Sequence, residues 1–183
     1  MSGSIIANPT GAFRPSPNFA TFLDADSYDL CRDMDRTVET WQAGATISAG
    51  DAVYVSAVGT SGGVPPVVSP LPVDATLAQQ QRYLGVALDS AVSGDKVDVV
   101  TRGPAVTNLA ATETNIGSGS AGTAVTTMAF GTSCTATAAS GNTAGQVNGV
   151  TPTASTITGT ILGFALTAEV GTTNKFVMYV EHR

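Results

Sequence analysis

The hydrophobic positions of this chain fall in short alternating runs that are separated by glycine-containing turns. The clearest runs are residues 52–58, 83–88 and 96–101, which are rich in valine and other residues that favour strands. Gly50-Asp51 precedes the first run, and Ser93-Gly94-Asp95 lies between the second and the third. These patterns predict three strands, and the last two are expected to form a hairpin.

Two weaker signals lie between these runs. Residues 64–68 follow a Gly62-Gly63 turn, which predicts a hairpin with the first strand, although Pro65 and Pro66 are typical of an edge strand. Residues 75–81 give the one helical signal, with Asp74 as the expected N-cap.

A segment of the first half recurs near the C-terminus. Leu84-Gly-Val-Ala-Leu88 returns as Leu162-Gly-Phe-Ala-Leu166, and each copy is followed by a lysine and an alternating strand, at 96–100 and 175–179. One repeat is too little for a solenoid. The repeat predicts two similar hairpins within one barrel or sandwich, with residues 161–166 and 175–180 closing the core formed by the three strands.

Residues 103–168 contain few charges and consist of threonine, alanine, glycine and serine over long stretches. That composition is also compatible with disorder. Alternation at 124–130 and the run at 156–166 favour strands with small side chains, with long loops near 115–122 and 138–150. A surface with so few charges is poorly protected against self-association, so packing against further copies is expected.

Composition sets the fold class and the domain division. The chain has 183 residues, of which only 12% are charged, and a formal net charge of −6. We expect an all-β fold, a compact barrel or sandwich over residues 41–183 with a Thr/Ala/Gly-rich insertion at about 110–156. Residues 1–40 are expected to form an extended, aromatic and acidic arm. Six of the fourteen acidic residues lie near the end of this arm: Asp24, Asp26, Asp29, Asp33, Asp35 and Glu39.

Few residues are available for catalysis or metal binding. His182 is the single histidine, and a Ser-His-Asp device would have to use it. The two cysteines, Cys31 and Cys134, cannot form a four-cysteine zinc site. Free thiols are expected there, with a bond between them left open. A calcium loop starting at Asp24 would need glycine at its sixth position, where Asp29 stands, so an acidic surface is favoured over a metal site. We expect the protein to have no enzymatic activity and to bind no metal ion and no cofactor.

The charge and the apolar runs also restrict partners and location. A net charge of −6 argues against a nucleic-acid surface. The longest apolar stretches, such as 161–166, are too short to span a bilayer, and no basic start followed by an apolar run indicates a signal peptide. The expectation is a soluble protein made in the cytoplasm.

Several turn-and-strand motifs resemble one known family. Gly44-Ala-Thr-Ile-Ser-Ala-Gly-Asp-Ala-Val53, Leu84-Gly-Val-Ala-Leu88, Ser93-Gly-Asp-Lys-Val97 and Arg102-Gly103 follow one another as in the small capsid cement, or decoration, proteins of tailed bacteriophages. The resemblance covers about residues 44–109. It implies successive strands of a compact β-barrel and a non-enzymatic protein of the virion, made in the host cytoplasm. The family's members typically form homotrimers on the outer surface of the head, where they bind the major capsid protein and clamp adjacent capsomers.

Two sets of residues are candidate functional positions. In the arm, aromatic and proline residues are expected to dock along a capsid subunit or a sister protomer, the alternative being that they cover the barrel's own base or are disordered. These arm residues are Phe13, Pro15, Pro17, Phe19 and Phe22. The core and turn motif consists of Gly50, Asp51, Gly85, Val86, Gly94, Asp95, Gly163 and Phe164.

An alternative function uses other aromatic residues. A virion fibre or tail module, or a cell-surface adhesin, would also be β-rich and charge-poor and would bind a host glycan through residues such as Trp41 and Tyr54. Such proteins usually have fibrous repeats or a signal peptide, so the capsid interpretation is favoured.

Overall fold

The computed structural model describes residues 36–57, 66–110, 122–124, 128–137, 142–152, 160–167 and 174–181. Strands dominate this part of the chain and belong to one continuous sheet, which confirms the all-β prediction. In chain order the elements are β1 (Thr37–Ala43), β2 (Ala52–Ala57), β3 (Val67–Pro70), the helix α3 (Leu77–Gln80), β4 (Tyr83–Ala87), β5 (Lys96–Asn108), β6 (Gly122–Ala124), β7 (Ser133–Ala136), β8 (Val147–Pro152), β9 (Gly163–Ala165) and β10 (Lys175–Glu181).

The first five strands close into a barrel. Their order is β1-β3-β2-β4-β5, and β5 pairs again with β1. β3 is parallel to β1, and the other neighbours are antiparallel. The hairpin of β4 and β5 was predicted from the sequence and is confirmed. Closure removes the free strand edges that would otherwise be open to pairing with another chain.

The closing strand, β1, differs from the prediction. Residues 161–166 and 175–180 were predicted to close the core, and residues up to 40 were predicted to belong to the arm. β1 instead begins at Thr37 and pairs with β5 as far as Gln42, which lies opposite Lys96. Its first four side chains are exposed, so the strand lacks the apolar alternation by which a strand is recognised in a sequence.

β3 lies between β1 and β2, so the prediction of an edge strand is wrong. The strand begins at Val67, after Pro65 and Pro66. Pro66 therefore removes no hydrogen-bond donor from the ladder, and the strand's own proline, Pro70, is its last residue, opposite Val53 of β2.

The short helix α3 also differs at its start. Thr76, and not Asp74, is the N-cap, because its side chain accepts a hydrogen bond from the Gln79 N–H while the Gln79 side chain accepts from the Thr76 N–H. This reciprocal pair is a capping box. Asp74 has a positive φ of 55° and lies in the turn before the helix.

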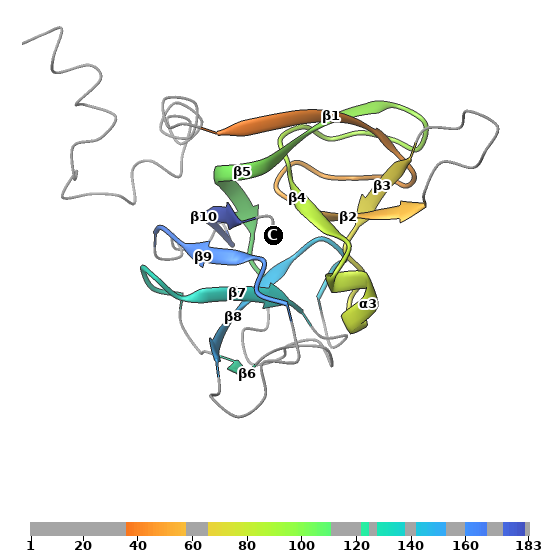
Figure 1. Cartoon of the computed structure of the whole chain (residues 1–183). Helices are drawn as coiled ribbons and strands as arrows, with labels where there is room; N and C mark the ends of the chain where they lie inside the picture. The colour runs from red at the N-terminus through yellow and green to blue at the C-terminus, as the bar shows by residue number, and fades with distance from the viewer. Residues whose placement is uncertain are drawn as a thin grey trace, which may run out of the picture.

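β5 is longer than predicted and leaves the first barrel midway along its length. Its first half pairs with β1 and β4, and its second half pairs with β10, from Arg102 to Asn108. Gly103 lies at this transition with φ of 105°, a conformation that favours glycine, and Pro104 follows it. In Figure 1, β5 runs from the group of strands β1–β4 to the group β6–β10.

The remaining strands curl into a second closed unit. From the second half of β5 the order continues β10-β9-β7-β8, and a parallel bridge between Leu109 and Val147 brings β8 back to the end of β5. The Ala110 N–H donates to the Val147 carbonyl at 2.9 Å, which reinforces this closure. β6 adds to the outer end of β8. β8 begins at Val147, inside the segment predicted as a loop, so that part of the loop prediction is wrong.

The second barrel repeats the strand register of the first. Two of the three pairs of β2 with β4 have a counterpart in β7 with β9, and pairs between the other strands of the two barrels correspond in the same way. In the following list each pair of the first barrel is given before its equivalent in the second: Val53↔Gly85 with Cys134↔Gly163; Val86↔Val100 with Phe164↔Tyr179; Tyr54↔Ser69 with Thr135↔Asn148; Trp41↔Val97 with Thr107↔Phe176; and Ala43↔Val68 with Leu109↔Val147.

Turns and single hydrogen bonds are repeated as well. The N–H of Gly50 donates to the Ala87 carbonyl at 2.8 Å, and the N–H of Gly131 donates to the Ala165 carbonyl at 2.7 Å. Both glycines have positive φ, 90° and 81°. The two similar hairpins seen in the sequence therefore belong to two successive barrels, which corrects the prediction that they share one.

The two cores are joined. The interior of the first barrel is one apolar cluster: Ala43, Ile47, Val53, Val68, Leu84, Ala87, Ala91, Val97 and Val99. A larger cluster contains the equivalent interior positions of the second barrel, among them Leu109, Cys134, Val147, Leu162 and Phe176. That larger cluster also includes residues of the first barrel that alternate with its interior set, namely Ala52, Tyr83, Val86 and Val100. One outer face of the first barrel is therefore buried against the second.

Candidate functional site

The arm residues expected to dock on a partner lie outside the described residues. These are Phe13, Pro15, Pro17, Phe19 and Phe22, and the same is true of Cys31, His182 and the acidic cluster from Asp24 to Asp35. The docking role of the arm therefore stays a prediction.

The core and turn motif does not form one site. Its residues are distributed over turns and strands of both barrels. Gly50-Asp51 lies in the turn before β2, Gly94-Asp95 lies in the turn before β5, Gly85-Val86 lies in β4 and Gly163-Phe164 lies in β9. Phe164 is half-buried rather than in the core, because it occupies an outward position of the second barrel.

Asp51 connects the turn before β2 to the second half of β5. Its carboxylate accepts hydrogen bonds from the Ser48 N–H at 2.8 Å and from Asn108 Nδ2 at 2.9 Å. The same amide donates to the Ala49 carbonyl at 3.1 Å, and the Asn108 N–H donates to the Gly50 carbonyl at 3.0 Å. These bonds join the first barrel to the start of the second, so the role of Asp51 here is structural.

Burial raises the pKa of Asp51 above its ordinary value, and the hydrogen bonds from Ser48 and Asn108, with the charge of Lys175, act against that rise. A carboxyl group whose pKa is raised by folding takes up protons more readily in the folded protein. Its contribution to stability is therefore fully present below the unfolded pKa of about 4 and is lost as the pH rises through the folded value.

We expect the stability of the wild type relative to Asp51→Asn to fall as the pH increases from about 4 to 7. Urea unfolding of both proteins across this range measures the difference, in which the other titrating groups cancel. A difference that is constant with pH, or that grows in favour of the wild type, would contradict the assignment.

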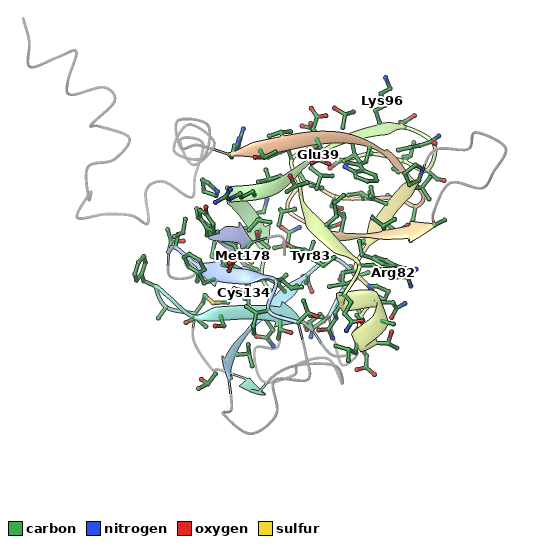
Figure 2. The ribbon with its side chains drawn as sticks, viewed as in Figure 1. Glu39, Arg82, Tyr83, Lys96, Cys134 and Met178 are labelled. Atoms are coloured by element: carbon green, nitrogen blue, oxygen red, sulfur yellow. The ribbon has the colours of Figure 1, made fainter. Side chains whose placement is uncertain are left out.

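Tyr83, on the outer face of the first barrel, and Cys134, inside the second, are two buried titratable groups. Both belong to the larger apolar cluster, and Figure 2 shows them near Met178 in the middle of the molecule. Burial raises the pKa of the Tyr83 phenol and of the Cys134 thiol, so both stay protonated at neutral pH. A buried, protonated thiol is a poor nucleophile and a poor metal ligand. Within the described part of the chain, no three His, Cys, Asp or Glu residues are grouped as metal ligands would be.

Among the described residues, the buried hydroxyl of Tyr83 has no hydrogen-bond partner. Since an unpaired buried hydroxyl costs stability, Tyr83→Phe should raise the free energy of unfolding by about 1 kcal/mol. Thermal and chemical unfolding measure this change. Tyr54→Phe is the matched control and should be nearly neutral, because Tyr54 is half-buried, with Arg82 over its ring. A loss of stability in Tyr83→Phe would show that the hydroxyl makes a favourable contact.

The second barrel presents aromatic side chains on its outer surface. The rings of Phe164 and Tyr179 stack across β9 and β10, with centroids 5.2 Å apart and an interplanar angle of 15°. Phe130 lies at the tip of the turn before β7 and is 76% exposed. Phe130 and Tyr179 were not recognised from the sequence as candidate functional residues. The available signal was that an aromatic residue, Phe130, directly precedes the turn glycine Gly131, whereas Ala49 precedes the equivalent Gly50 of the first barrel.

The aromatic residues of the glycan alternative are already engaged by other groups. Trp41 Nε1 donates to the Glu39 carboxylate at 3.2 Å, and Arg82 lies over the ring of Tyr54 at 5.7 Å from its centroid. Both side chains are half-buried, and they lie on different strands.

Comparisons with known proteins find matches among solved structures. No family model and no curated protein matches this chain. Among solved structures, the N base of the head fiber gp8.5 of bacteriophage phi29 matches 80% of this chain and 95% of that chain, with 15% identity and a TM-score of 0.47. At this identity and TM-score a shared function does not follow. In the described part of this chain, no helix has the length and apolar character needed to cross a membrane.

Proposed function

We propose that this chain is a structural protein of a bacteriophage head and that it has no enzymatic activity. In this proposal it binds the major capsid protein on the outer surface of the shell, as a homotrimer, and bridges adjacent capsomers. The observation that carries the proposal is the placement of the cement-like motifs. Residues 44–53, 84–88 and 93–97 form the turn into β2, the strand β4 and the turn into β5 of one closed barrel. That is the arrangement the family resemblance implies.

The surface chemistry of the described residues suits a protein partner. Exposed aromatic side chains contribute most of the binding energy in many protein interfaces, and Phe130 is such a side chain. A trimer that contacts several capsomers at once gains avidity from contacts that are individually weak. A role on a capsid therefore requires no deep pocket and no reactive group.

Binding to heads tests the proposal. Purified protein is mixed with expanded empty heads of the phage that encodes it, prepared without decoration protein, and sedimented. The proposal predicts saturable binding with a fixed number of copies per head, and little binding to unexpanded heads. Equal, non-saturating binding to both kinds of head, or none, would refute it.

Deletion of residues 1–22 tests the arm. Because the described strands begin at Thr37, the truncated protein should keep the melting temperature of the full chain. Its occupancy on expanded heads should fall at least tenfold if the arm phenylalanines are bound by the capsid or by a sister protomer. Unchanged occupancy of the truncated protein would exclude a docking role for this segment.

A further inference from the structure

Two basic side chains line one small hollow where the two barrels meet. Arg36 lies directly before β1, and Lys175 is the first residue of β10. Apolar side chains from the turn before β2, the end of β4 and the second half of β5 form most of the remaining wall: Ala49, Ala87, Leu88 and Val106. The hollow is partly open to solvent and has room for about one water-sized group.

One nitrogen of Arg36 lacks a hydrogen-bond acceptor. Its terminal nitrogen Nη1 is buried and, in the part of the chain that the structure describes, has no hydrogen-bond partner. An unpaired buried donor destabilises the folded state, and a charged donor does so more than a neutral one. An acceptor in the hollow would remove this cost.

The two positive charges favour an acceptor that is an anion. The chain has eight basic residues against fourteen acidic ones, and two of these eight line the same hollow. Like charges repel more strongly beside apolar groups than in water. Asp51 is near enough to interact electrostatically with Lys175, but its carboxylate already accepts hydrogen bonds from the Ser48 N–H and from Asn108. Asp51 is also not part of the wall of the hollow, so the anion has to come from elsewhere.

We propose that the hollow between Arg36 and Lys175 binds one carboxylate group. A guanidinium group can donate two parallel hydrogen bonds to a carboxylate, and an ammonium group adds a second positive charge that accepts many orientations. The bound group links the start of β1 to the start of β10, and so connects the two barrels on this side of the molecule. The inference does not depend on a role on phage heads, because it concerns the isolated chain.

The carboxylate has two possible sources. One is a free carboxylate ion from solution, for which acetate is the probe. The other is the acidic segment before β1, in which Asp29, Asp33 and Asp35 lie a few residues ahead of Arg36. Even an extended chain from Asp29 to Arg36 spans at most about 25 Å, so all three carboxylates start close to the hollow.

Urea unfolding of the full chain in sodium acetate at neutral pH tests the binding. Arg36→Met should lower the urea midpoint if a carboxylate is bound, because a charge-assisted contact is lost. If the hollow is empty, the same substitution removes an unpaired buried donor and should raise the midpoint or leave it unchanged. Arg102→Met is the matched control and should leave the midpoint unchanged, since Arg102 is exposed and lies opposite Thr37 at the same end of β1.

Further measurements identify the source. If the segment supplies the carboxylate, the triple variant Asp29→Asn, Asp33→Asn, Asp35→Asn should lower the midpoint, but not in a chain that already carries Arg36→Met. If a free ion supplies it, the triple variant should behave like the wild type. Replacing sodium chloride by sodium acetate at equal ionic strength should then raise the midpoint of the wild type and not that of Arg36→Met.

Two results would overturn the inference. The first is an Arg36→Met protein that is no less stable in acetate than the wild type or the Arg102→Met control. The second is a loss of stability in Arg36→Met that depends neither on acetate nor on the three aspartates, because that loss would come from packing of the arginine side chain alone.

Discussion

Replacing Gly85 by alanine should destabilise the protein by about 3 kcal/mol or more, and replacing Gly163 should have a similar effect. A Cβ atom at Gly85 would lie well inside contact distance of the Val100 carbonyl oxygen, and one at Gly163 would meet the Tyr179 carbonyl oxygen in the same way. Both obstacles are backbone atoms in a paired strand, which cannot move away without breaking the ladder. The two glycines are equivalent positions of the two barrels.

Urea unfolding of the two variants measures these losses. Gly94→Ala is the control, because a Cβ there would have no atom within 4 Å. Its positive φ of 97° limits the cost to backbone strain of about 1–2 kcal/mol. If Gly85→Ala or Gly163→Ala is no more destabilising than Gly94→Ala, the close approach of the paired strands is wrong. Because one apolar cluster joins the barrels, each variant should still unfold in a single transition.

Phe176→Ala should cost about 3–5 kcal/mol, as expected for a large side chain deleted from a packed core. Phe176 is fully buried inside the second barrel, where it occupies the position of Val97 in the first. Phe164→Ala should cost much less, about 1 kcal/mol, because Phe164 is half-buried and loses mainly its stacking with Tyr179. The sequence placed Phe164 in the core and would predict the larger value for it.

Denaturation midpoints of these two variants decide between the assignments. The two residues lie on neighbouring strands, β9 and β10, so their local surroundings are otherwise similar. Equal costs, or a larger cost for Phe164→Ala, would contradict the division of the second barrel into an interior and an outer face.

The sequence predicted the strands whose side chains alternate between core and surface. β2, β4 and the first half of β5 were recognised in this way. The repeat was recognised only at β4–β5 and β9–β10, since there the close approach of two backbones requires glycine at Gly85 and Gly163 in both copies. Elsewhere the equivalent residues, such as Trp41 and Thr107, have the same side-chain direction and strand register but are of different types. The repeat therefore cannot be recognised there from the sequence.

The surface was less predictable than the core. The register between β2 and β4 is irregular at Val53 and Tyr54, and this irregularity determines which side chains of β4 point outward. No turn residue in the sequence indicates it. Val86 and Phe164 occupy equivalent positions, yet one is covered by the second barrel and the other is not. Whether each side chain is buried depends on which of the two barrels it belongs to, and not on the residues next to it in the sequence. For this reason Phe164 was assigned to the core, and its stacking with Tyr179 on the outer face was missed.

The stability of the shell tests the central claim, that this protein reinforces a phage head by bridging capsomers. Expanded empty heads are heated in a calorimeter with and without saturating amounts of the protein. We expect the melting temperature of the capsid protein to rise as occupancy increases and to stop rising at saturation, since a ligand that binds only the intact shell stabilises it. A shell that melts at the same temperature with the protein fully bound would contradict the claim.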